Sequence, residues 1–93
     1  MKTYNITNSN VTYAGKEIRF AYAMMKDGSY EIHSDDPGFR EIIGTDGFTY
    51  EGRGTAPYVQ VNGNIHHYLT GTALQFGEII YSIIISAKTS KMP

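Results

Sequence analysis

Three glycine-containing dipeptides divide the chain into short segments of strand-like composition. They are Asp27-Gly28, Asp46-Gly47 and Asn62-Gly63. Tight hairpin turns select Asp-Gly and Asn-Gly because these residues accept the positive φ angles that such turns need. A chain that reverses at these points builds an antiparallel sheet from hairpins. We therefore expect a mainly β (β-rich α+β) fold, either a small sandwich or an open barrel, with one or two short helical turns.

The register of the first hairpin follows from its apolar residues. Apolar side chains alternate with other residues along 17–25, and the alternation returns along 29–35. A three-residue loop at 26–28 pairs Tyr22 with Ile32, and the two apolar faces then coincide. A two-residue loop would place Ile32 opposite a polar face. The three-residue loop is therefore the predicted connection.

The turn at Asn62-Gly63 leaves two registers to compare. A two-residue turn pairs Gln60 with Ile65 and mixes polar with apolar residues on both faces. A three-residue loop pairs Val59 with His67 and aligns more apolar surface, so we expect this register. The opposite face of the hairpin then carries Tyr58, Gln60, His66 and Tyr68.

A short helix is predicted between these two hairpins. Asp36 suits the N-cap, Pro37 suits the first helical position, and Gly44 suits the end of the helix. The inner face of this helix would hold Phe39, Ile42 and Ile43. A second helical turn is expected at 72–76, between two glycines.

The most apolar segment, 78–87, is expected to be a strand because it is dense in β-branched isoleucine. Alternation places one set of its side chains in the core, namely Ile79, Tyr81, Ile83 and Ile85. Ile80 and Ile84 would then meet a helix or a second subunit. The segment predicts a central or interface strand, and with it a homo-oligomer formed through Glu78–Ala87. Further strands are expected at 2–7 and 11–14.

Length and composition exclude several classes of protein. The 93 residues fit a single domain, which we place at 1–87, followed by a polar tail at 88–93. The chain has no cysteine, which excludes disulfides, thiol catalysis and thiolate metal sites. The net charge is −1 and there is no run of Lys or Arg, so no nucleic-acid partner is expected.

No apolar run approaches the roughly 20 residues that a membrane-spanning helix needs. The N-terminus also lacks an apolar signal stretch. We therefore expect a cytoplasmic protein with no membrane partner.

Side chains that could carry chemistry do not form a recognisable catalytic set. His66 and His67 are adjacent on a predicted strand, so they should point to opposite faces and not chelate one ion together. His33 and Asp35 share a face, but a pair at this spacing is common on solvated strands. No serine lies in a nucleophile elbow. We expect no catalytic residue, no cofactor and no metal site.

The strongest ligand-binding signal is the loop Gly52-Arg53-Gly54, which leads toward Tyr58. Glycines let backbone amides approach an anion, and Arg can grip a phosphate or carboxylate with two hydrogen bonds. Tyrosine rings offer stacking surface at a small entropy cost. If the tyrosine face does not pack against another strand or subunit, a planar anionic ligand is expected at Arg53, Tyr58, Gln60, His66 and Tyr68.

These features favour a small non-enzymatic binding protein that blocks a macromolecular partner or sequesters a small anionic, nucleotide-like ligand. In size, the chain resembles the small inhibitors encoded by phages and mobile elements. Two alternatives stay open. One is a small enzyme acting on an anionic substrate, with His66 or His33 as base and Arg53 as electrostatic clamp. The other is a structural or assembly protein.

Overall fold

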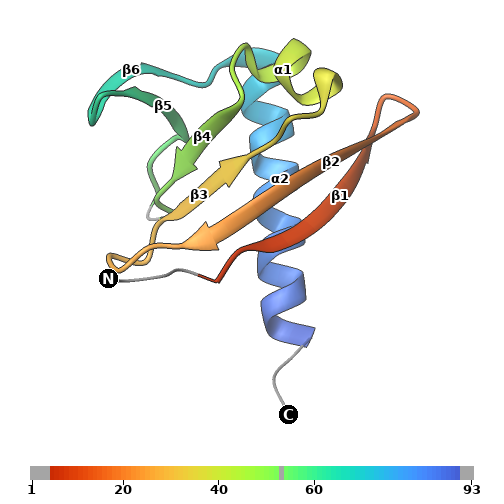
Figure 1. Cartoon of the computed structure of the whole chain (residues 1–93), viewed down its shortest axis with the longest axis horizontal. Helices are drawn as coiled ribbons and strands as arrows, with labels where there is room; N and C mark the ends of the chain where they lie inside the picture. Colours follow the sequence, from red (N-terminus) through yellow and green to blue (C-terminus); the bar gives the residue numbers. More distant parts are fainter. Residues whose placement is uncertain (1–4, 53, 91–93) are drawn as a thin grey trace.

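The computed structural model describes residues 5–52 and 54–90, which form one sheet and two helices (Figure 1). Six antiparallel strands follow one another across the sheet in chain order: β1 (Thr7–Tyr13), β2 (Lys16–Met24), β3 (Tyr30–His33), β4 (Gly47–Tyr50), β5 (Tyr58–Val61) and β6 (Asn64–Tyr68). Helix α1 (Pro37–Ile43) joins β3 to β4, and helix α2 (Gly71–Ser90) follows β6. The sheet is open and does not close into a barrel. The expected hairpin-built, β-rich α+β fold is confirmed.

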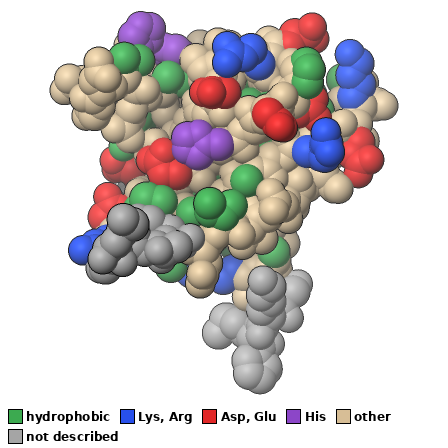
Figure 2. All heavy atoms as spheres, viewed as in Figure 1, with side chains coloured by type: hydrophobic (Ala, Val, Ile, Leu, Met, Phe, Trp, Pro, Cys, Tyr) green, Lys and Arg blue, Asp and Glu red, His purple; other side chains and the backbone are tan. Residues whose placement is uncertain are grey.

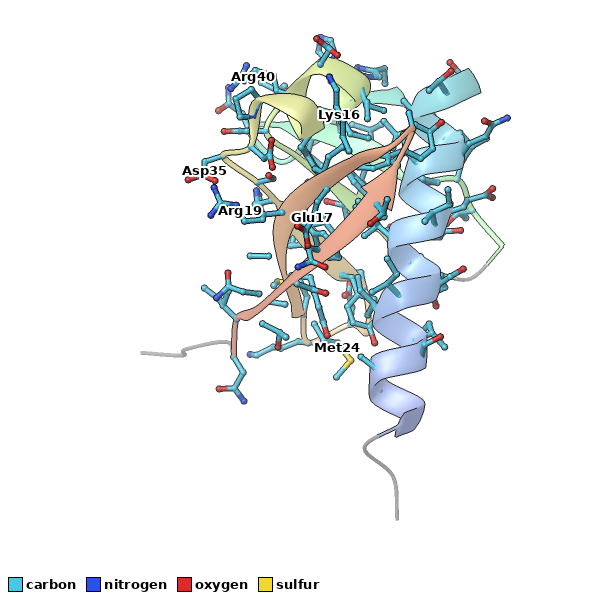
Figure 3. All side chains as sticks on the ribbon, turned by 90° about the vertical axis from the view of Figure 1, so that its right-hand side faces the viewer. Lys16, Glu17, Arg19, Met24, Asp35 and Arg40 are labelled. Atoms are coloured by element: carbon cyan, nitrogen blue, oxygen red, sulfur yellow. The ribbon has the colours of Figure 1, made fainter. Side chains whose placement is uncertain are left out.

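The molecule has two layers, because α2 lies along one face of the sheet (Figures 1 and 3). The core fills the space between these layers and is made of buried apolar side chains, among them Ile18, Phe20, Ile32, Phe48, Val59, Phe76, Ile80 and Ile84. The sheet face turned away from α2 is called the open face below. Neither described helix is both long and apolar enough to cross a bilayer.

The predicted strand at Glu78–Ala87 is wrong, because these residues belong to α2. Phe76, Ile80 and Ile84 recur every four residues along one side of this helix and are at most 1% exposed. Ile79, which the strand interpretation assigned to the core, is 39% exposed. A β-branched residue disfavours a helix by only about 0.5 kcal/mol. Burial of an isoleucine side chain contributes about 1.5–3 kcal/mol, so packing against the sheet outweighs propensity.

This helix removes the reason for expecting an oligomer through the same segment. The side chains of Ile80 and Ile84, which were expected to meet a helix or a second subunit, are covered within the chain itself. The expected helical turn at 72–76 is the beginning of α2. The helix continues to Ser90 and so includes the first residues of the segment 88–93 that was expected to be a tail.

The first hairpin and helix α1 form as predicted. Tyr22 pairs with Ile32 across β2 and β3, and the loop closes through a 2.8 Å hydrogen bond from the Met25 N–H to the Ser29 carbonyl. The Asp36 side chain caps α1 by accepting a 2.9 Å hydrogen bond from the Gly38 N–H. The helix ends at Gly44 in the left-handed conformation, with Phe39, Ile43 and the partly buried Ile42 on its inner side.

The two strands expected at 2–7 and 11–14 correspond to one strand, β1. Residues 2–4 lie outside the described part of the chain, and Asn5 and Ile6 are not in a strand. β1 runs without a break from Thr7 to Tyr13, and Ala14 lies in the turn that leads to β2. Pairing with β2 over its full length holds this strand at the sheet edge.

The β5–β6 hairpin combines the two registers that the sequence offered. Its tip is a two-residue turn, and Gln60 pairs with Ile65 as that turn requires. A β-bulge follows, so that Val59 pairs with His67 as the three-residue loop would require. The bulge leaves His66 as the extra residue on β6. The preferred register is therefore right for one half of the hairpin and wrong at its tip.

Candidate binding face

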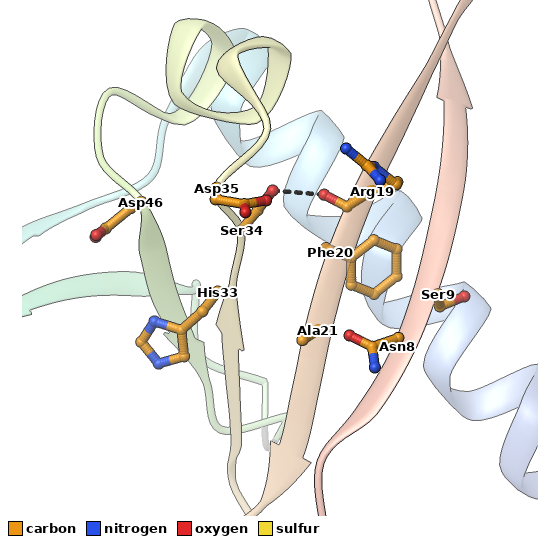
Figure 4. A pocket seen from close by; sticks show the side chains of 9 residues that line it. All are labelled: Asn8, Ser9, Arg19, Phe20, Ala21, His33, Ser34, Asp35 and Asp46. Carbon is orange, nitrogen blue, oxygen red and sulfur yellow. Dashed lines mark hydrogen bonds between the residues drawn. The ribbon is translucent and has the colours of Figure 1, made fainter.

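A row of small residues surrounds one histidine on the open face. Strand pairing aligns Asn8, Ala21, His33 and Gly47 across the four strands β1 to β4. Because alanine and glycine fill little space, hollows lie on both sides of the His33 imidazole. The larger hollow, of about 570 Å³, is lined by Asn8, Ser9, Arg19, Phe20, Ala21, His33, Ser34, Asp35 and Asp46 (Figure 4). The smaller, of about 240 Å³, extends toward Gln60.

Gly47 is the residue that makes room for this imidazole. A Cβ atom at Gly47 would overlap Nδ1 of His33 and would lie 2.8 Å from the carbonyl oxygen of Ile32. Any other residue at this position would push the ring away or displace the β3 backbone. The lack of a side chain at Gly47 therefore allows the His33 imidazole to lie between the two hollows.

His33 forms an ion pair with Glu31, which is on the same face of β3. The His33 Nε2 and Glu31 Oε1 atoms are 3.5 Å apart. This contact is the main cause that raises the pKa of His33 and lowers the pKa of Glu31, and burial opposes both shifts. The Thr49 hydroxyl donates a 2.8 Å hydrogen bond to the other carboxylate oxygen, and the Gln60 amide donates a 2.9 Å bond to that hydroxyl. The polar side chains from β3 to β5 are thus held in one network.

The Glu31–His33 pair should couple most strongly in mildly acidic solution. Because the folded-state pKa of His33 is raised, its contribution to stability is complete below 6.5 and is lost as pH rises through the folded-state value. The pKa of Glu31 is lowered, so its contribution is present above 4.5 and is lost as pH falls. A double-mutant cycle of Glu31→Gln and His33→Gln should give a coupling energy of about 0.2–1 kcal/mol at pH 5.5. Urea unfolding should show a smaller coupling at pH 8.5, and equal values at both pH values would contradict the pairing.

A second cross-strand row places two tyrosines beside this network. Thr49 pairs with Tyr58, and Tyr58 pairs with Tyr68. The rings of the two tyrosines meet edge to face, with their centroids 5.8 Å apart. The Tyr58 hydroxyl donates a 2.7 Å hydrogen bond to Glu51 Oε2. That bond, aided by burial, raises the pKa of Tyr58 to about 12. Tyr58 is therefore a fixed donor, whereas Tyr68 is half exposed.

The structure brings together only part of the predicted ligand site. Tyr58, Gln60 and Tyr68 share the open face, as alternation along the strands predicted. Arg53 lies outside the described residues. His66 does not lie opposite Gln60, because the bulge gives that place to Ile65.

Two carboxylates, those of Glu31 and Glu51, belong to this face in addition to the predicted residues. Only uncharged side chains and one histidine were expected around Tyr58 and Tyr68, but Glu51 accepts a hydrogen bond from Tyr58, and Glu31 is linked to Gln60 through Thr49. The alternation along β3 did place Glu31 and His33 on its non-apolar side. The pairing of β3 with β4 and of β4 with β5 could not be predicted from the sequence, and it is this pairing that joins the two hairpins into one face.

Expecting His66 and His67 to point to opposite faces was wrong. Their Nδ1 atoms are 2.7 Å apart, at hydrogen-bond distance. The bulge is the physical reason, since the extra residue interrupts the strict alternation of side chains. Within residues 5–52 and 54–90, no cluster of three or more His, Cys, Asp or Glu side chains could hold a metal ion.

Negative charge prevails around His33. Glu31, Asp35 and Asp46 line the two hollows, and the basic group that lines the larger one is Arg19. Arg40 reaches Asp46 only at 3.9 Å, with both side chains largely exposed. Figure 2, which looks onto the open face, shows acidic side chains above and to the left of a histidine near its middle and a basic side chain to its right. The face is therefore suited to cationic groups.

Comparisons with protein-family models, with the curated proteins and with the solved structures gave no match for this chain.

Proposed function

We propose that the chain is a non-enzymatic binding module whose open face docks a protein partner that presents basic side chains, and thereby blocks that partner. The observation that supports this most is the acidic surface around His33, with a hollow on each side of the imidazole. Helix α2 lies against the other face of the sheet (Figures 1 and 3).

The carboxylates at the larger hollow are available to a partner. Asp35 is exposed and makes no hydrogen bond or ion pair with any residue in the described part of the chain. The Asp46 side chain is 72% exposed and has only the long contact with Arg40. A volume of about 570 Å³ has room for a lysine or arginine side chain. A cation there would gain charge-assisted hydrogen bonds.

The same charges favour a protein over the small anionic ligand that the sequence analysis considered. A nucleotide stacked on Tyr58 and Tyr68 would lie beside Glu51 and close to Glu31, and like charges repel at such a site. A protein partner can also use the apolar side chains at the adjoining hairpin. Val61, Ile65 and Tyr68 are each about half exposed there. Polar groups beside exposed apolar side chains are typical of protein interfaces.

Charge reversal at the larger hollow tests this function. The Asp35→Lys, Asp46→Lys double variant should lose at least tenfold in affinity for a protein captured by the wild-type chain from its native host. Added salt should weaken the capture by wild type, because exposed charges are screened. The matched control is Glu78→Lys, which makes the same kind of change at an exposed position on α2. Capture that is indifferent to reversal at Asp35 and Asp46, but not at Glu78, would place the interface elsewhere.

A further inference from the structure

The β-bulge in β6 joins two imidazoles on an edge strand of the sheet. His66 is the unpaired extra residue, and the next residue, His67, pairs with Val59. The two rings meet at an angle of 75° with centroids 5.0 Å apart, and their Nδ1 atoms approach to 2.7 Å. All five residues of β6 are exposed, so an ion could reach both nitrogens from solvent.

The distance between the two nitrogens fits one coordination geometry better than another. With metal–nitrogen bonds of about 2.0 Å, neighbouring ligands of a square-planar ion are about 2.8 Å apart, whereas tetrahedral ligands are about 3.3 Å apart. The observed separation of 2.7 Å matches neighbouring square-planar positions. Square-planar sites with nitrogen ligands are typical of Cu²⁺ and Ni²⁺, and Cu²⁺ binds more tightly by the Irving–Williams order.

We propose that the Nδ1 atoms of His66 and His67 form a two-nitrogen site for Cu²⁺, which would lie to one side of the line that joins them. Both imidazoles would then be neutral and carry their proton on Nε2, so that each Nδ1 lone pair is free to bind the ion. Water would occupy the other coordination positions, since no third ligand from the described residues completes the set. This site is separate from the acidic hollows around His33 and does not depend on the proposed partner. It could lose or keep its metal without changing the prediction for Asp35 and Asp46.

The test is a titration of the full chain with CuCl₂, followed by calorimetry and by electron paramagnetic resonance. We expect one ion to bind with a spectrum that shows two coordinated nitrogens. His66→Gln and His67→Gln should each lower the affinity about tenfold or more, and Ni²⁺ should bind more weakly than Cu²⁺. Both side chains are exposed, so these variants are expected to fold.

The chain supplies a matched control, because His33 is its only other histidine. His33→Gln should bind Cu²⁺ as the wild type does. If copper is held elsewhere, for example by the terminal amine, binding survives both His66→Gln and His67→Gln, and the proposal is wrong. Equal losses for all three histidine variants would also overturn it, as would a wild type that binds no copper.

Discussion

The Ile80→Ala variant is expected to lose about 2–5 kcal/mol of unfolding free energy. The Ile80 side chain is fully buried in the core between α2 and the sheet. Truncation removes its apolar burial and leaves a cavity that a packed interior closes only in part. A domain of this kind has about 5–15 kcal/mol in total, so the loss is a large share of its stability. Urea unfolding followed by circular dichroism measures it.

Ile79→Ala is the matched control for this prediction. The two residues are neighbours of identical chemistry, but Ile79 is 39% exposed. Alanine also favours a helix slightly more than isoleucine does. The control should therefore change stability by less than about 1 kcal/mol. A strand at 78–87 would reverse the order, since alternation would bury Ile79, so a larger loss for Ile79→Ala would contradict the helix.

The Phe39→Ala variant is expected to lose about 3–5 kcal/mol. Phe39 is the point at which α1 joins both layers of the molecule, and its side chain has no exposed surface. Its ring stacks on Phe48 of β4 and meets Phe76 of α2 edge to face, each at 5.9 Å between centroids. Each aromatic pair adds about 0.5–1.5 kcal/mol to the burial of the ring.

Urea unfolding of Glu41→Ala provides the comparison on the same helix. Glu41 is exposed on α1, so its truncation should change stability by less than about 0.5 kcal/mol. If Phe39→Ala were as stable as Glu41→Ala, α1 would not be anchored in the core. Because α1 leads from β3 to β4, loosening it should also disturb the hollow around His33 and Asp46.

The features that the sequence predicted correctly depend on residues close together in the chain. The loop at 26–28 follows from alternation in its two flanking strands, because one residue more or fewer would turn Ile32 to the wrong face. The limits of α1 follow from the cap at Asp36 and the left-handed Gly44. In the same way, alternation placed Tyr58 and Gln60 together on the open face.

Most of the candidate site depends on pairing between hairpins, which no local pattern contains. Pairing of β3 with β4 places Gly47 beside His33, and pairing of β4 with β5 brings Tyr58 into line with Thr49. His66 and His67 touch because a bulge interrupts β6. The bulge lets Gln60 pair with Ile65 at the two-residue turn while Val59 still pairs with His67. A strand in either register alone would be regular, and its two imidazoles would lie apart.

The secondary structure of the isoleucine-rich segment 78–87 depends on tertiary contacts and not on its sequence alone. A spacing of four, as between Phe76, Ile80 and Ile84, puts side chains on one face of a strand and also on one face of a helix. The sequence by itself therefore placed Ile80 and Ile84 together on one covered face, and it determined the register of the β2–β3 hairpin. The choice between helix and strand depends on the sheet, because its apolar face is stabilised when another element packs on it. The free energy gained by burying isoleucine side chains against that face exceeds the weak preference of isoleucine for strands.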